Sequence, residues 1–248
     1  MESSPISPQA RSVVEQWAGS DDPAVIFDFN GTLSDDEPIL FGIFEELFAT
    51  HLNWSMTAQD YQRDLLGHSD REIIEKAIAR SGAIADVEQL LDLRKQRYRE
   101  AVVGDNPIRS ETVELVRLLA DRAVPMAIVT GAQRDDVTAV LRNSPAGEFI
   151  DIVVAEEDVR RGKPDPEGFL AGAAHLGRDP ASVLVFEDSV PGVRGALAAG
   201  MRCIAVAARP GGDLRDVAPA VVERLSVEVV SHALAPGCLL YTSPSPRD

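Results

Sequence analysis

The sequence predicts an α/β protein whose three-layer core has a parallel sheet covered by helices, with an all-helical segment inserted after the first strand. Two observations carry this prediction. Short apolar runs of β-forming residues alternate with helical stretches of about ten to fourteen residues, which is the pattern of βαβ units. Between residues 36 and 104 no such run occurs, and apolar residues recur instead at three- and four-residue spacing.

Five apolar runs predict the strands, and a sixth, weaker segment predicts a last strand and helix. Helical stretches alternate with these runs, such as SETVELVRLLADRA at 110–123 before PMAIVTG. This alternation favours parallel strands joined by crossover helices. The predicted strands are AVIFDF (24–29), PMAIVTG (125–131), DIVVA (151–155), SVLVFED (182–188) and RCIAVAA (202–208), followed by PAVVERLSVEVVSHAL (219–234).

Four helices are predicted in the insert, and two of them carry capping signals. Thr57 is a candidate N-cap, and Ser69 is followed three residues later by Glu72, which is the pattern of a capping box. Gly82 marks the C-terminal end of the same helix. The four predicted helices are PILFGIFEELFATHL (38–52), TAQDYQRDLL (57–66), SDREIIEKAIARSG (69–82) and ADVEQLLDLRKQRYREAVV (85–103).

The predicted organisation is an N-terminal extension (1–20), a core made of two segments (21–35 and 105–235) and a helical cap (36–104). Residues 238–248, CLLYTSPSPRD, share neither the composition nor the periodicity of the preceding chain. They resemble, codon for codon, the translation of a transposase-type sequencing adapter. We expect this tail to be artefactual and assign no function to it.

The composition excludes several classes of function. Of 248 residues, 45% are hydrophobic and 26% are charged, which is enough apolar material for a globular core. The formal net charge of −16 argues against general binding to nucleic acids or anionic membranes. The sequence shows no secretory signal pattern and no apolar window long enough for a membrane span, and its two cysteines suit neither disulfides nor zinc. We expect a cytoplasmic monomer or small homo-oligomer.

Polar residues suited to phosphoryl chemistry follow three of the predicted strands and occupy one loop. In an open parallel sheet the carboxyl ends of the strands form the ligand-binding edge, so these residues are expected to converge. A carboxylate can attack phosphorus, carboxylates at two strand ends can hold Mg²⁺, and a hydroxyl and an ammonium can hold phosphoryl oxygens. The residues are Asp28 and Asn30 after the first strand, Thr130 and Gly131 after the second, Lys163 in RRGKPDPEGF, and Glu187 and Asp188 after the fourth.

These motifs resemble those of the haloacid dehalogenase superfamily, in its branch of phosphatases and phosphomutases with a helical cap. The resemblance implies a Rossmann-like core. It rests on FDFNGTLSDDE (27–37), IVTG (128–131), GKPDP (162–166) and VFEDSVPGVRGALAAGM (185–201), which are similar to the first to fourth motifs of that family. In the cap, LLGHSDREII (65–74) is similar to the segment that faces the active site in relatives of β-phosphoglucomutase and phosphoglycolate phosphatase.

The resemblance implies a nucleophile and a metal site. Asp28 would take the phosphoryl group from the substrate and would also bind Mg²⁺. The backbone carbonyl of Asn30 would be a second ligand. Asp188 would bind Mg²⁺ directly, and Glu187 would support the ion directly or through water.

The resemblance also implies contacts to the substrate. Thr130, Gly131 and Lys163 would bind the phosphoryl group, and Lys163 would relieve repulsion among the acids. Gly67 and His68 would contact the substrate from the cap.

Asn30 departs from the family pattern, in which this position is usually Asp. The Asp protonates the leaving oxygen and then takes a proton from the attacking water, and an amide can do neither. General acid–base catalysis is typically worth about 10² to 10⁴ in rate, so we expect slow turnover with metal binding retained. His68, Asp35 and Glu37 are candidates for the missing role, and the sequence does not rank them.

The predicted function is Mg²⁺-dependent removal of phosphate from a small phosphorylated metabolite through an aspartyl-phosphate intermediate. One alternative is a protein that binds a phosphoryl ligand with little turnover. Another is a phosphonatase or dehalogenase type of hydrolase. A phosphonatase would need a cap lysine for an imine, but Lys76 and Lys95 lie outside apolar runs, and dehalogenation needs no Mg²⁺.

Overall fold

A six-stranded parallel sheet forms the centre of the computed structural model, which describes residues 6–65, 68–207 and 214–234. The strand order is β3-β2-β1-β4-β5-β6, so β1 lies in the interior of the sheet. The predicted α/β fold class is confirmed. The strands are β1 (Ala24–Phe27), β2 (Met126–Val129), β3 (Ile152–Val154), β4 (Val183–Glu187), β5 (Arg202–Val206) and β6 (Val221–Val222).

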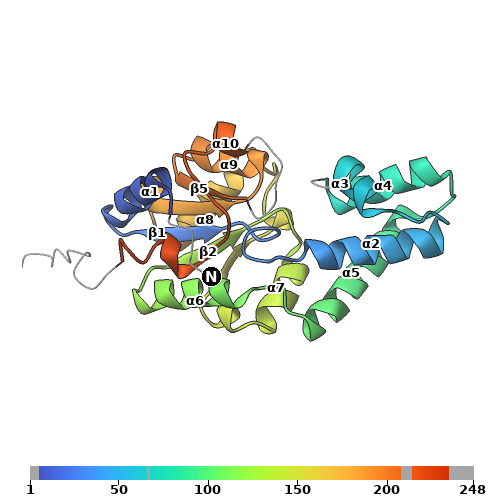
Figure 1. Cartoon of the computed structure of the whole chain (residues 1–248), viewed down its shortest axis with the longest axis horizontal. Helices are drawn as coiled ribbons and strands as arrows, with labels where there is room; N and C mark the ends of the chain where they lie inside the picture. Colours follow the sequence, from blue (N-terminus) through green and yellow to red (C-terminus); the bar gives the residue numbers. More distant parts are fainter. Residues whose placement is uncertain (1–5, 66–67, 208–213, 235–248) are drawn as a thin grey trace, which may run out of the picture.

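Helices cover both faces of the sheet (Figure 1). Because successive side chains of a strand point to opposite faces, Val25 and Phe27 belong to one buried cluster and Ala24 and Ile26 to another. The first cluster includes residues of α1, α6 and α7, and the second includes residues of α8 and α9. The helices of the core are α1 (Pro8–Ala18), α6 (Ser110–Asp121), α7 (Arg134–Arg142), α8 (Glu167–Leu176), α9 (Val190–Ala198) and α10 (Leu214–Val217).

Four helices between β1 and α6 lie to one side of the sheet (Figure 1). The capping signals act as predicted: Thr57 and Asp60 form a capping box, as do Ser69 and Glu72. Gly82 ends its helix in the left-handed conformation, at a φ of 69°. The helices are α2 (Glu37–His51), α3 (Ala58–Asp64), α4 (Asp70–Ser81) and α5 (Val87–Gly104), and we call them the cap.

A buried arginine joins the cap to the core. Arg94 of α5 is 4% exposed, and its guanidinium pairs with Asp136 of α7 and with Asp70 of α4, the latter at 2.9 Å. Its charged group also lies 4.9 Å from the ring centre of Tyr98. Because leaving a buried charge without its partner is costly, this cluster favours one position of α5 against α7.

Both ends of the core differ from the sequence-based expectation. The segment assigned as an extension (1–20) contains α1, and Trp17 of that helix is fully buried and donates from Nε1 to the Ala24 carbonyl at 2.9 Å. The helix predicted within 219–234 is wrong, because a short 3₁₀ turn, η4 (Val227–Val229), follows β6. Its valines are β-branched, which disfavours a regular α-helix.

No helix in the described part of the chain is both long and apolar enough to cross a membrane.

We predict that Trp17→Ala lowers the free energy of unfolding by about 3–5 kcal/mol, because it empties a fully buried aromatic site and removes a hydrogen bond. Urea denaturation measures the loss. Glu15→Ala, on the exposed side of the same helix, is the matched control and is expected to change little. An equal effect of the two substitutions would mean that α1 is not part of the cooperative core.

Candidate active site

The end of β1 places Asp28 at the carboxyl edge of the sheet, beside the end of β4. The Asp28 side chain is buried, and its backbone N–H donates to the Phe186 carbonyl at 2.9 Å. The loop that follows closes through a bond from the Gly31 N–H to the Ser34 carbonyl at 2.7 Å. Gly31 has a φ of 78°, and a Cβ there would overlap the Asp188 carboxylate. Only glycine therefore lets Asp188 approach this loop so closely.

The Lys163 ammonium lies between two buried carboxylates. It donates to Oε1 of Glu187 at 2.5 Å and to Oδ1 of Asp28. The exposed fractions of the three side chains are 16% for Lys163, 8% for Asp28 and 1% for Glu187. The motif around Lys163 is thus joined to the ends of both β1 and β4.

Burial and neighbouring charges shift the pKa values of Asp28 and Lys163. Burial raises the pKa of Asp28 to about 7, Lys163 opposes the shift and the Glu187 charge adds to it. Burial alone would lower the pKa of Lys163, but the Asp28 and Glu187 carboxylates outweigh it and raise that pKa above its usual value. Lys163 is therefore a cation at neutral pH, whereas Asp28 titrates near neutral pH.

Glu187 is held by the start of the next helix as well as by Lys163. Its Oε2 accepts from the Ser189 N–H at 2.6 Å and from the Ser189 hydroxyl at 2.9 Å. Ser189 is the N-cap of α9 and accepts from the Gly192 N–H, and a Cβ at Gly192 would overlap the Glu187 carboxylate. Sequence reasoning missed this role of Ser189, although Ser before V-P-G is a recognisable N-cap signal.

Three carboxylates come close enough to hold a metal ion. One oxygen each of Asp28, Glu187 and Asp188 lies within 4.8 Å of the others. Oxygen ligands of this kind suit hard divalent cations. The donor set and the Gly31 cradle that admits Asp188 fit a cation, although Glu187 already uses both oxygens in other bonds.

Thr130 lies at the end of β2, the strand beside β1. It is 6% exposed, its N–H donates to the Val154 carbonyl at 3.0 Å, and its hydroxyl oxygen accepts from the Ala132 N–H at 3.0 Å. The hydroxyl hydrogen can still donate to a ligand oxygen. Gly131 is exposed, and a Cβ there would meet nothing within 4 Å. The adjacent ends of β2, β1 and β4 thus carry the predicted polar residues.

The Asn30 side chain bonds to an acid that sequence reasoning missed. Its Nδ2 donates to Oδ2 of Asp36 at 2.5 Å, and the same oxygen accepts from the Tyr98 hydroxyl at 2.6 Å. Burial raises the pKa of Asp36 to about 6, against the Tyr98 and Asn30 hydrogen bonds. Of the predicted substitutes for the acid–base group, Asp35 pairs with Arg109.

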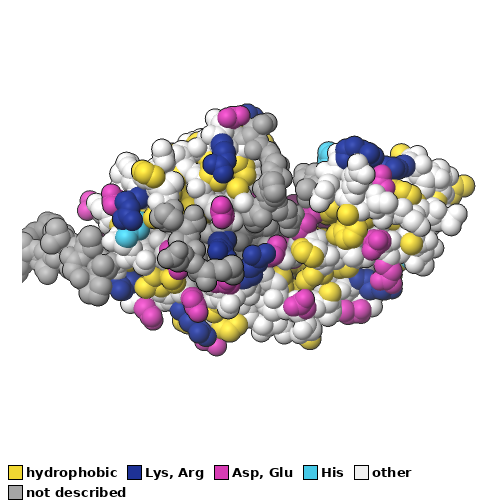
Figure 2. Space-filling view, viewed as in Figure 1, with side chains coloured by type: hydrophobic (Ala, Val, Ile, Leu, Met, Phe, Trp, Pro, Cys, Tyr) yellow, Lys and Arg dark blue, Asp and Glu magenta, His cyan; other side chains and the backbone are white. Residues whose placement is uncertain are grey.

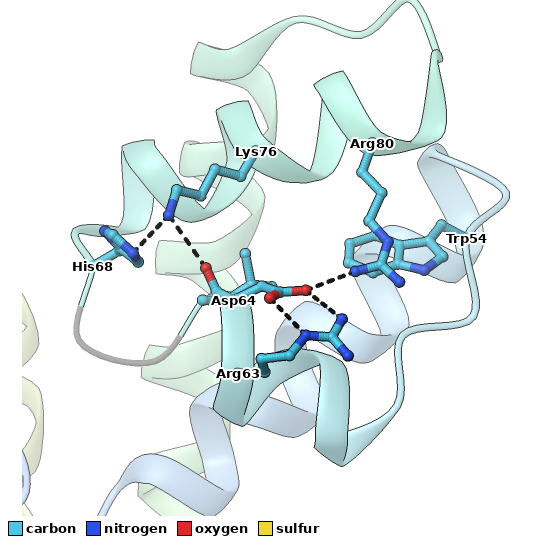
Figure 3. Close-up of a pocket in the computed structure, with 7 residues that line it drawn as sticks. Trp54, Arg63, Asp64, His68, Lys76 and Arg80 are labelled. Carbon is cyan, nitrogen blue, oxygen red and sulfur yellow. Dashed lines mark hydrogen bonds and ion pairs between the residues drawn. The ribbon is translucent and has the colours of Figure 1, made fainter. Parts of the chain in front are cut away.

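His68, the substitute predicted in the cap, lines a pocket of about 360 Å³ between α3 and α4 (Figure 3). Its Nε2 lies 2.6 Å from the Lys76 ammonium, and its Nδ1 lies 3.7 Å from the Glu72 carboxylate. Among the described residues, no hydrogen bond or ion pair joins His68 to Asp28. Figure 2 shows a group of Lys and Arg side chains over this part of the cap. Gly67 lies outside the described residues.

Comparison with known proteins identifies the family. The haloacid dehalogenase-like hydrolase family matches residues 25–206, and the chain belongs to it. The chain is 32% identical over 189 residues to the protein CbbY of Rhodobacter capsulatus, covering 73% of this chain and 83% of that one. It is 29% identical over 184 residues to a phosphorylated carbohydrates phosphatase of Thermotoga maritima, with the same coverages. The predicted family and the predicted hydrolase class are confirmed.

Solved structures agree on the fold. CbbY from Rhodobacter sphaeroides in complex with phosphate superposes with a TM-score of 0.69 at 24% identity, over 83% of this chain and 95% of that one. A putative β-phosphoglucomutase from Thermotoga maritima gives a TM-score of 0.72 at 24% identity, over 85% and 97%. At this identity the likeness supports the Rossmann-like fold.

We predict that Lys163→Met lowers the free energy of unfolding by about 3–5 kcal/mol at pH 8 without metal, because it leaves two buried carboxylates without their cation. The loss should be smaller at pH 5. An acid with a raised pKa in the folded state, here Asp28, stabilises the fold below that pKa and ceases to do so as the pH rises through it. Urea denaturation in EDTA at both pH values measures this.

Lys76→Met removes an exposed lysine and is the control for that comparison. Equal effects of the two lysine substitutions at pH 8 would contradict a charge balance centred on Lys163.

Proposed function

We propose that the chain is a Mg²⁺-dependent phosphatase that removes phosphate from a small phosphorylated metabolite through an aspartyl-phosphate on Asp28. The observation that carries this proposal is the buried contact of Lys163 with both Asp28 and Glu187, beside the Asp188 carboxylate. A nucleophilic carboxylate, a cation for phosphoryl oxygens and an acidic metal site are the three parts that such a reaction needs.

The proposed reaction has two steps. In the first, an Asp28 carboxylate oxygen attacks phosphorus, the ester P–O bond breaks and its electron pair goes to the leaving oxygen, which takes a proton from solvent. In the second, water attacks the phosphorus of the aspartyl-phosphate and gives a proton to solvent. The P–O bond to Asp28 breaks, and inorganic phosphate and the Asp28 carboxylate are released. Lys163 and the Thr130 hydroxyl would donate to the phosphoryl oxygens, with Gly131 beside them, and thereby offset their charge.

The proposed ligands of Mg²⁺ are the Asp28 and Asp188 carboxylates and the backbone carbonyl of Asn30, with Glu187 in support. When bound, the ion supplies positive charge that reduces repulsion between the phosphate and the acids in a chain of net charge −16. Because Asn30 would contribute its backbone, its amide side chain does not weaken this site.

The proposed substrate class is a phosphorylated sugar or a similar small metabolite. Support comes from the relatives, one of which is named a phosphorylated carbohydrates phosphatase, and another a validoxylamine A 7'-phosphate phosphatase of Streptomyces hygroscopicus. We propose that the part of the cap around Gly67 and His68 contacts the substrate. The helical-cap boundaries (36–104), a cytoplasmic location and a monomer or small oligomer stay predictions.

A second candidate function is binding of a phosphoryl ligand with little turnover. The observation that favours it is the Asn30 amide, which is bonded to Asp36 and can neither give nor take a proton. This candidate keeps the same ligand and metal but predicts slow phosphate release. A dehalogenase reaction has less support, because the carboxylate cluster suits a metal that dehalogenation does not need. A phosphonatase reaction has less support, because imine formation needs a neutral lysine and Lys76 is exposed to solvent.

We predict phosphate release in Mg²⁺ from at least one compound in a set of sugar phosphates, phosphoglycolate, nucleotides and acyl phosphates. EDTA and the Asp28→Asn variant should each reduce release to the background rate, because each removes a part that the first step needs. A malachite green assay measures the rates. Asp92→Asn, an exposed acid of the cap, is the control.

Retained release in Asp28→Asn would refute the assigned nucleophile. No release from any compound, combined with Mg²⁺-dependent binding of inorganic phosphate, would favour the binding protein.

A further inference from the structure

Asp36 fixes the side chain of Asn30 beside the nucleophile. The Asn30 amide nitrogen and the Asp36 carboxylate are 2.5 Å apart, and Asp36 is 1% exposed. A carboxylate only accepts hydrogen bonds, so the nitrogen of the amide and not its oxygen faces Asp36. The orientation of the Asn30 amide is therefore set by the residue at position 36.

The same Asp36 oxygen is also held from the cap. Tyr98 of α5 is fully buried and donates its hydroxyl to Oδ2 of Asp36 at 2.6 Å. Asp36 itself is the N-cap residue of α2, so it lies where the chain passes from the core into the cap. The acceptor that holds Asn30 is thus fixed by both the first and the last helix of the cap.

Positions 30 and 36 form a donor–acceptor pair, and this limits which residues they can carry. A carboxylate at both positions would put two acceptors at hydrogen-bond distance in a buried place. Two carboxylates so close cannot both stay ionised. Either one of them takes a proton, or the two side chains move apart. An Asp at position 30, free to exchange a proton with substrate, therefore requires a donor at position 36.

We propose that Asp36 is a positioning residue matched to Asn30, which holds one amide N–H so that the second can donate to an oxygen of the reacting phosphoryl group. This inference rests on the proposed function and specifies how its atypical position is built. Such a fixed amide stabilises charge on the oxygen without proton transfer. The residue at position 36 then decides whether an Asp at position 30 can act as an acid and base.

The test compares the wild type with N30D, the exchange variant N30D/D36N and the control N30D/D35N. In the exchange variant, the amide nitrogen introduced at position 36 takes the place of Oδ2. It can donate to the carboxylate at position 30 and to the Tyr98 hydroxyl oxygen, so both hydrogen bonds are kept with reversed polarity. The control removes the same charge from the neighbouring acid, Asp35, which pairs with Arg109, whereas the Asn30 amide bonds to Asp36. The whole chain is used, with glucose 6-phosphate and ribose 5-phosphate as probes in Mg²⁺.

We expect the exchange variant to release phosphate about 10² times faster than N30D, since it gains a working acid and base. The gain should lie in kcat, with KM nearly unchanged, because ground-state contacts to the probe are the same. The N30D/D35N control should stay at the rate of N30D. An N30D variant as fast as the exchange variant, or a control that also rescues it, would overturn the matched pair.

Thermal unfolding at pH 8 tests the pair without reference to activity. N30D should lower the midpoint, and D36N in the same chain should return it to within about 2 °C of the wild type, whereas D35N should not. If no variant releases phosphate, the proposed function fails while this order of midpoints still supports the pair. If the midpoints of N30D and N30D/D36N are equal, the pair is refuted even in an active phosphatase.

Discussion

The contact on which the rest of the site depends is the Lys163 ammonium between the Asp28 and Glu187 carboxylates. Two buried acids at neighbouring strand ends repel each other, and burial already penalises their charge. The ammonium makes their approach possible and ties the loop before α8 to both β1 and β4. With that balance in place, a third acid, Asp188, can lie against Gly31, where a side chain would exclude it.

A buried polar network extends from this site into the cap. Asn30 bonds to Asp36, Asp36 to Tyr98, and the Tyr98 ring lies under the Arg94 guanidinium, which pairs with Asp136 of the core. Residues that share such a network have coupled effects on stability. The position of the cap and the orientation of the Asn30 amide are therefore parts of one arrangement, which explains why an acid at position 36 accompanies an amide at position 30.

Local sequence signals predicted much of this structure. The apolar run before Asp28 gave β1, and the pairing of Ser69 with Glu72 gave the start of α4, because both signals act over a few residues. The burial of Trp17 could not be predicted from its neighbours in the sequence, because α1 packs against the distant strands β4 and β5. The sequence also could not show which of the acids Asp35, Asp36 and Glu37 bonds to Asn30. This depends on how the loop after β1 closes, and in the structure the bond is made by Asp36.

The central claim is that Asp28 is a phosphoryl acceptor in a site whose Asn30 cannot help water to attack. Acetyl phosphate tests it most directly, because acetate leaves without needing a proton. The aspartyl-phosphate on Asp28 should then persist, because its hydrolysis is slow. The measurement is mass spectrometry of the peptide that contains Asp28, after brief reaction in Mg²⁺ and acid quench. The account predicts one added phosphoryl group on Asp28 in the wild type and none in Asp28→Asn. A label on another residue, or a label that survives Asp28→Asn, would contradict it.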